Sequence, residues 1–166
     1  MFNFLERFFR LPSSFERKKL LLLSLVFFII TGVYAVLRPL KISVFINLVG
    51  REYLPVCNLL TMALMIPFMF GYSRLVDRLK KHQIVFVLFV TYAIFGLIFA
   101  FFLSSSVVGL VNTQARASRL LGWIFFIITD LYPAFVGGAF WAFANSINSA
   151  EFAKRYYGII CSAAKI

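Results

Sequence analysis

Acidic residues are scarce in this sequence. Only six of its 166 residues are Asp or Glu, and charged residues of both signs make up just 14% of the chain. A soluble domain of this length leaves much of its surface in water and needs more polar side chains than this composition offers. The 62% share of apolar residues and the mean hydropathy of +0.92 therefore exclude a soluble domain and indicate an integral membrane protein.

Cysteine is also scarce, and the usual signatures of enzyme chemistry are missing. The two cysteines, Cys57 and Cys161, form no C-x-x-C motif, which argues against a disulfide framework and against a zinc site. The sequence shows no cluster of metal ligands, no nucleophile–base pair and no Gly-rich phosphate loop. We therefore expect a protein that is not an enzyme and that holds no metal and no cofactor.

Basic residues, by contrast, are plentiful and give a net charge of +11. In a soluble protein this excess would suggest nucleic-acid binding, but membrane proteins concentrate Lys and Arg in cytoplasmic loops. Here twelve of the seventeen lie in residues 1–19, in residues 74–82 and after Ala150. This distribution predicts that the chain contacts a lipid bilayer and no nucleic acid, with both termini in the cytoplasm.

Four long apolar stretches each approach or exceed the roughly 20 residues that a helix needs to cross the hydrocarbon core. They are continuous and lack the alternation of a β-barrel, so they predict an all-α polytopic membrane protein. We expect the four transmembrane helices at about 20–48, 53–73, 83–103 and 120–148. Residues 1–19 would be a basic cytoplasmic N-terminus that is either a short amphipathic helix or frayed, and residues 151–166 a cytoplasmic tail.

The first span ends in the stretch YAVLRPLK, which places two cations beside a proline. Neighbouring helices can satisfy the carbonyl that Pro39 frees, so the helix can continue. Five residues at helical spacing then share one face: Thr31, Tyr34, Arg38, Lys41 and Phe45. The two cations either reach the lipid head groups or line a cavity for an anion such as phosphate.

The fourth span carries a second polar face. Its members at helical spacing are Asp130, Ala134, Gly137, Trp141, Asn145 and Asn148. A carboxylate inside a membrane needs a partner or a proton, so Asp130 either forms an ion pair with Arg38 or Lys41 that only orients helices, or serves function. Trp141 is either an interfacial or packing residue or a base-stacking one. Gly137 and Gly138 would let another helix approach closely.

The loop between the second and third spans reads GYSRLVDRLKKHQ. Asp77-Arg78 followed by Lys80-Lys81 resembles the conserved loop of major-facilitator transporters, where the acidic and basic residues have a structural role. The alternative is an ordinary positively charged loop, in which His82 is solvated.

Taken in order, four segments are similar to the nucleotide transporter family of plastids and intracellular bacteria, the ATP/ADP translocase type. They are YAVLRPLK, GREYLPVCNLL, YSRLVDRLKKHQIVF and DLYPAFVGGAFWAFANSINSAEFAKRYYG. The resemblance extends over nearly the whole chain after residue 30. The chain departs from the family pattern at Ile42 and Phe152, where the family has acidic residues.

This resemblance implies a major-facilitator-like fold of twelve helices, of which the chain would be the N-terminal portion. It implies exchange of ATP for ADP, or import of other nucleotides, some with protons. The family's important lysine of the first helix and glutamate of the fourth fall on Lys41 and Asp130. We expect the substrate to be bound by Lys41, Arg38, Asp130, Tyr34, Trp141 and Asn145.

Three functions stay open at this point. The first is nucleotide transport, most simply ATP/ADP exchange in a bacterial inner membrane, with the missing C-terminal helices possible on another chain. The second is a non-transporting or degenerate fragment that acts only as a membrane subunit. The third is a small proton-coupled exporter in which Asp130 titrates.

Overall fold

The computed structural model describes residues 14–162, so most of the predicted amphipathic N-terminus lies outside the described residues. Within them all regular structure is helical, in the order α2 (Ser14–Leu48), η1 (Arg51–Tyr53), α3 (Leu54–Arg78), α4 (Lys81–Leu103), α5 (Leu120–Tyr132), η2 (Pro133–Gly137), α6 (Gly138–Ile147) and α7 (Ala150–Ser162). Four of the resulting segments are long and apolar enough to cross a membrane: 14–48, 51–78, 81–103 and 120–147. The predicted all-α polytopic fold with four spanning helices is thereby confirmed.

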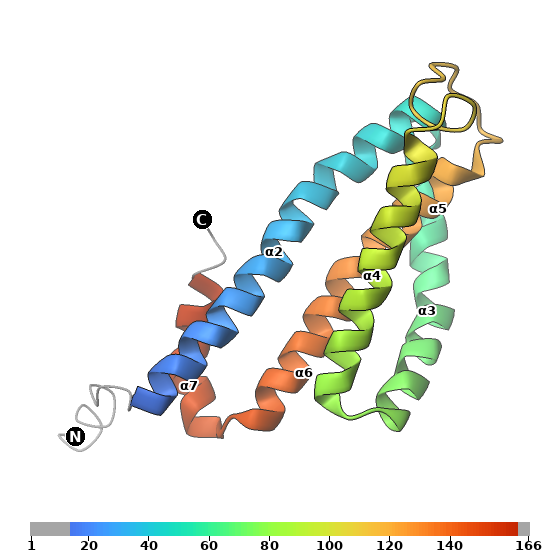
Figure 1. The fold of residues 1–166 in the computed structure, drawn as a ribbon. Coiled ribbons are helices and arrows are strands. Elements are labelled where there is room, and N and C mark those ends of the chain that lie inside the picture. Colours follow the sequence, from blue (N-terminus) through green and yellow to red (C-terminus); the bar gives the residue numbers. More distant parts are fainter. Residues whose placement is uncertain (1–13, 163–166) are drawn as a thin grey trace.

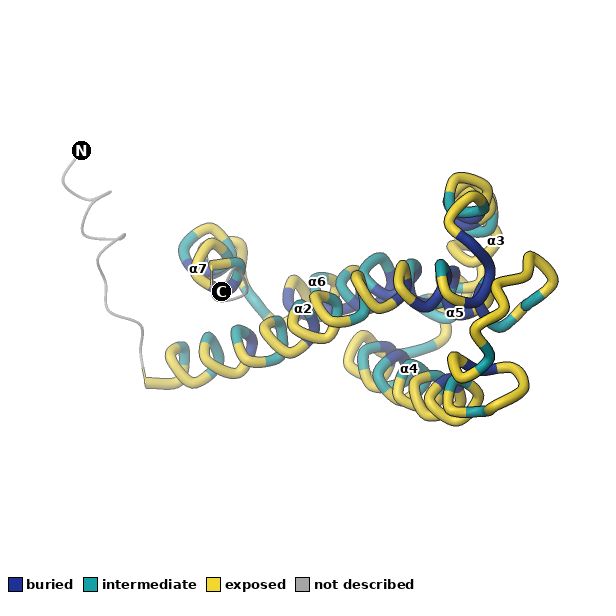
Figure 2. The backbone as a smooth tube through the Cα atoms, turned by 90° about the horizontal axis from the view of Figure 1, so that it is seen from above, coloured by how far each residue is buried: buried dark blue, intermediate teal, exposed yellow. Residues whose placement is uncertain are grey.

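The helices run lengthwise in an open bundle whose two ends differ (Figure 1). One end holds the start of α2, the α3–α4 turn and the link between α6 and α7, and the other holds the end of α2 and the long 104–119 connection. Helix α5 packs against α2 and α3, α6 packs against α4, and α7 packs against α2. The outer faces of α3 and α4 are mostly exposed and apolar (Figure 2), as expected of side chains that face lipid.

Proline affects the first and fourth spans differently. Helix α2 continues through Pro39, as the sequence predicted, but it begins at Ser14 rather than near residue 20 and is 35 residues long. In the fourth span, Pro133 begins a five-residue π-helical segment, η2, which separates α5 from α6. Proline has no N–H, so a main-chain carbonyl in the preceding turn loses its hydrogen-bond donor. Inside a membrane no water is present to donate to that carbonyl instead, and a local π-helical segment is one way in which the helix adjusts. Nearby, the Tyr92 hydroxyl donates to the Ile128 carbonyl at 3.4 Å and satisfies a main-chain acceptor one turn before the break.

Residues 150–162 form an amphipathic helix, α7, where the sequence analysis assigned only a tail. Its apolar side packs on α2 through Phe152, Tyr156 and Ile160, all of which are buried. This helix fixes the position of two predicted site residues, as described below.

Gly122 of α5 lies close to the end of α2. A β-carbon there would lie 2.6 Å from Val49 Cγ2 and 3.2 Å from Leu48 Cβ. By contrast, nothing lies within 4 Å of a β-carbon built at Gly137 or Gly138. Among the described residues, Gly122 admits a neighbouring helix and Gly137 and Gly138 face open space, so their predicted role in close helix packing stays a prediction.

Gly122→Ala should consequently destabilise the protein by about 1–3 kcal/mol, because the added methyl overpacks the α2–α5 contact. Gly138→Ala is the matched control, since its added methyl meets open space and alanine favours a helix. Thermal unfolding of both variants in the same detergent tests this. Equal melting temperatures would contradict the assigned contact.

Candidate functional site

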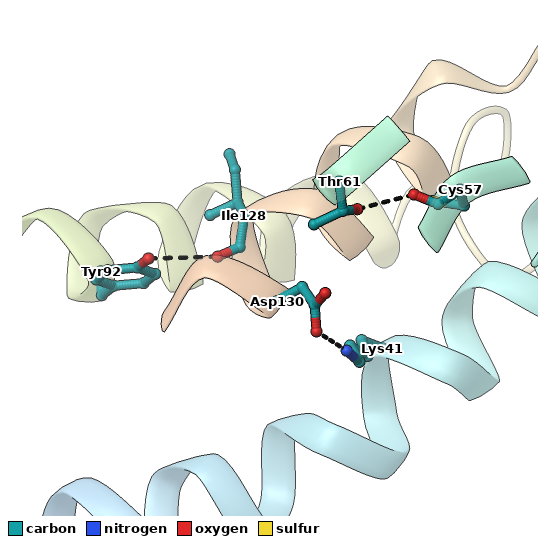
Figure 3. A network of polar contacts seen from close by, with 6 residues as sticks. All are labelled: Lys41, Cys57, Thr61, Tyr92, Ile128 and Asp130. Carbon is teal, nitrogen blue, oxygen red and sulfur yellow. Dashed lines mark hydrogen bonds and ion pairs between the residues drawn. The ribbon is translucent and has the colours of Figure 1, made fainter. Parts of the chain in front are cut away.

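An ion pair joins α2 to α5 within the bundle. The Lys41 ammonium donates to Asp130 Oδ1 (Figure 3). The lysine is buried, with 8% of the residue exposed, whereas 31% of the Asp130 side chain is exposed. Asp130 lies near the middle of the 120–147 span, where an unpaired carboxylate would be costly. Each charge therefore has its counter-charge, and the carboxylate is the more accessible partner.

The sequence of α2 turns Lys41 toward this partner. Lys41, Phe45 and Leu48 recur at steps of three and four, and all three are buried on the face that meets α5. Because the helix is unbroken at Pro39, the register that places Phe45 in the core also places Lys41 there. The buried lysine is thus a consequence of the apolar pattern around it.

Phe126 adds a second contact to the lysine. The Lys41 Nζ lies 4.6 Å from the centroid of the Phe126 ring, a cation–π geometry worth roughly 2 kcal/mol when desolvated. Phe126 precedes Asp130 by four residues, so one face of α5 supplies both the ring and the carboxylate. The same ring packs edge-on against Phe45 at 5.2 Å. The sequence analysis did not single out Phe126, although its four-residue spacing from Asp130 was the available signal.

Helix α3 contributes the third side of this region. Cys57 is fully buried, and the Thr61 hydroxyl donates to the Cys57 carbonyl at 2.9 Å (Figure 3). The hydroxyl is therefore used within its own helix. Helix α3 thus presents no charge of its own to the ion pair at these two positions.

The other two candidates on α2 lie differently from Lys41. Arg38 is exposed, and within residues 14–162 it has no ion-pair or hydrogen-bond partner. Tyr34 is half-buried and packs against the core about two turns before Lys41. Of the two cations proposed as partners for Asp130, the structure pairs it with Lys41.

Trp141 and Asn145 meet α7 rather than the ion pair. The Trp141 ring lies 5.1 Å from both Phe27 and Tyr157, and the Tyr157 hydroxyl donates to Asn145 Oδ1 at 2.9 Å. Trp141 follows Asp130 by eleven residues, a rise of about 16 Å along a helix. These contacts favour the packing interpretation of Trp141, and the described residues do not bring it or Asn145 to Lys41.

The two loop candidates, Asp77 and Arg78, are exposed in the last turn of α3. A short turn follows, in which the Lys80 N–H donates to Gln83 Oε1 at 3.0 Å and so caps α4. The Asp77-Arg78 pair lies at the end of the bundle that holds the α3–α4 turn, away from the 104–119 connection (Figure 1).

A hollow of about 400 Å³ lies in the 104–119 connection, and none of the predicted site residues line it. The Arg119 guanidinium there donates to the carbonyls of Gly109, Asn112 and Gln114 at 2.7–3.1 Å. These bonds use the cation to hold the loop together. The arginine is therefore committed to loop structure.

Comparison with known proteins identifies the family of this chain. The family model described as TLC ATP/ADP transporter matches residues 2–166. The chain belongs to this family. ADP,ATP carrier protein 4 of Rickettsia typhi is 28% identical, over 86% of this chain and 31% of its own length.

Further relatives come from a plant and from another bacterium. ADP,ATP carrier protein 2, chloroplastic, of Arabidopsis thaliana is 25% identical over 90% of this chain and 28% of its own length. ADP,ATP carrier protein 1 of Chlamydia trachomatis is 26% identical over 91% of this chain and 33% of its own length. The chain thus spans about a third of the length of the curated relatives that it matches. No solved structure matches it significantly.

Proposed function

We propose that this chain forms the part of a nucleotide carrier in which Lys41 binds the phosphates of ATP and ADP. The observation that carries this proposal is the buried Lys41–Asp130 pair in a chain of the ATP/ADP transporter family. Relatives named ADP,ATP carrier protein support the substrate class.

The pair supplies a physical basis for exchange. A buried ammonium needs a counter-anion at every stage, because an uncompensated charge of this kind costs several kcal/mol. In the empty site Asp130 is that anion, and a nucleotide phosphate replaces it when substrate binds. The carboxylate is the more exposed partner of the pair. An incoming anion therefore first meets the carboxylate, which is the group that it displaces. One counter-anion replaces another, which keeps binding and release reversible.

Phe126 contributes to the same step. Its ring lies against Lys41 on the buried side of the pair and needs no rearrangement when Asp130 leaves. Arg38, exposed on α2 close to Lys41, supplies a second cation that can meet phosphates from outside the buried region. Tyr34, Trp141 and Asn145 would contact the remainder of the nucleotide only in a larger assembly.

The larger assembly is itself part of the proposal. Four spanning helices would form one portion of a major-facilitator-like carrier, with the remaining helices supplied by further chain or by a second subunit. The membrane would be a bacterial inner membrane with both chain ends in the cytoplasm. The excess of basic residues at the end where α2 starts and α7 begins supports that orientation.

Nucleotide-dependent stabilisation tests the proposal. In nanodiscs, ATP at about 100 times its dissociation constant should raise the free energy of unfolding by about 2.7 kcal/mol. ADP should act similarly, and adenosine, which lacks phosphates, should not. The absence of any shift with ATP would overturn the proposal in favour of a non-transporting subunit. An exporter would instead show pH-dependent cation efflux from vesicles without any nucleotide shift.

A further inference from the structure

Five basic residues lie in the first two turns of α2 and α7, two helices that pack against each other, and we call this set the basic corner: Arg17, Lys18, Lys19, Lys154 and Arg155. Lys19 links the start of α2 to the end of α6 and to α7. Its ammonium donates to the Ile147 carbonyl and lies 5.4 Å from the centroid of the Phe152 ring. The corner is therefore a fixed feature of the fold, built from segments about 130 residues apart in sequence.

The charge of this corner is strongly one-sided. The same segments contain five basic residues but only two acidic ones, Glu16 and Glu151. Arg17, Lys18 and Lys154 are exposed, while the Arg155 guanidinium lies over the Tyr156 ring at 5.8 Å. The α3–α4 turn at the same end of the bundle adds four more basic residues between positions 74 and 81 (Figure 1).

The opposite end of the bundle lacks such a surplus. Its basic residues within 14–162 are Arg51, Arg116 and Arg119, beside the acidic Glu52. Arg119 is already committed to three loop carbonyls, and Arg116 donates to the Gln114 side chain at 2.9 Å. The two ends of the same four helices therefore present different charge to their surroundings.

Directly beyond the corner the helix surface becomes apolar and exposed. Leu21, Leu22 and Leu25 follow Lys19 on α2 with 55–63% of each residue exposed, and Ile159 on α7 is 52% exposed. Cations next to an exposed apolar surface match the two parts of a phospholipid, an anionic head group and its acyl chains. A soluble anion would contact the cations alone, whereas a phospholipid can contact the cations and the leucines together.

We propose that the basic corner binds anionic phospholipids, with their phosphodiester head groups on Arg17, Lys18 and Lys154 and their acyl chains along Leu21, Leu22 and Ile159. Clusters of four to eight Lys or Arg beside a transmembrane helix attract anionic lipid in this way. This lipid binding is independent of nucleotide binding at Lys41.

The two tryptophans of the chain lie toward opposite ends of one span and serve as native probes. Trp141 contacts Phe27 on α2 and Tyr157 on α7, the two helices of the corner. Trp123 lies near the start of α5, where its indole N–H donates to the Ala117 carbonyl at 3.0 Å. Trp123→Phe leaves Trp141 as the sole reporter, and Trp141→Phe leaves Trp123.

The experiment reconstitutes each single-tryptophan protein in bilayers that contain brominated phosphatidylglycerol or brominated phosphatidylcholine in their acyl chains. Quenching of tryptophan fluorescence then gives the relative affinity for the two lipids. At Trp141 we expect a preference for phosphatidylglycerol of about fivefold that weakens as salt is raised. At Trp123 we expect a ratio near one.

Charge removal identifies the residues responsible. The triple change Arg17→Gln, Lys18→Gln and Lys154→Gln should bring the ratio at Trp141 close to one. The matched control, Arg51→Gln with Arg116→Gln, should leave that ratio unchanged. Equal quenching by both lipids at Trp141 would overturn the proposal, and so would a preference that survives the triple change or that is as large at Trp123. Circular dichroism of each variant verifies that helix content is retained.

Discussion

Lys41→Gln is expected to abolish saturable binding of ATP and ADP, weakening it by about 100-fold or more. The ammonium is the only buried basic side chain of the described residues that lies at Asp130, and glutamine offers no charge to a phosphate. Equilibrium binding of radiolabelled ATP to the protein in nanodiscs measures the effect. The variant also leaves the Asp130 carboxylate in place, which adds repulsion toward the phosphates.

The control for this variant is Lys154→Gln, which removes the same charge from an exposed position on α7. It should leave ATP binding within about twofold of the unchanged protein. Lys41→Gln/Asp130→Asn separates the roles of the two charges, because it removes the remaining carboxylate as well. Undiminished ATP binding by Lys41→Gln would exclude Lys41 as the phosphate-binding residue.

Asp130→Asn is expected to act in the opposite direction on binding. It removes the anion that, in the proposed site, competes with nucleotide for Lys41, so ATP should bind about tenfold more tightly or better. The same change leaves the buried ammonium without its counter-charge, so the nucleotide-free protein should be destabilised by about 2–3 kcal/mol. This figure is below that of a fully buried pair because 31% of the Asp130 side chain is exposed.

Titrations of ATP binding and of unfolding on the same preparations test both effects. Asp77→Asn is the control for affinity, since it removes the other aspartate from an exposed position at the end of α3 and should leave ATP binding unchanged. A packing role for the ion pair alone predicts that Asp130→Asn lowers stability and leaves nucleotide affinity unchanged or weaker. That outcome would rule out displacement of Asp130 by phosphate.

The sequence offered an ion pair between Asp130 and either Arg38 or Lys41 as one alternative, and the structure forms it with Lys41. Charges inside a membrane are few and must be compensated, so a lone carboxylate in the fourth span pointed to the cations of the first. Helical spacing then placed Lys41 on the face that Phe45 and Leu48 bury. The same spacing grouped Arg38 with Lys41 and Phe45, although Arg38 is exposed. Helical spacing shows which residues share a face of the helix, but it does not show how much of that face is buried.

Other features depended on tertiary packing that no local pattern contains. Gly122 lies close to Leu48 and Val49 at the end of α2, and its position on the fourth span alone did not indicate this contact. The sequence placed Trp141 and Asn145 on the face of Asp130, but their contacts are with Tyr157 on α7. That helix had no apolar run long enough to be predicted as a span. The roles of Trp141, Asn145 and the Asp77-Arg78 turn in transport stay predictions.

The proposed replacement of Asp130 by nucleotide phosphate at Lys41 can be tested at the carboxylate itself. The chain has two aspartates, so in Asp77→Asn a ¹³C label on the aspartate side-chain carboxyl reports on Asp130 alone. Saturating ATP is predicted to move this carboxylate resonance, because the ammonium leaves it, whereas adenosine leaves the resonance in place and Lys41→Gln abolishes the response. A resonance that does not move while bound ATP is demonstrated on the same sample would show that Lys41 and Asp130 stay paired, and would contradict the proposed site.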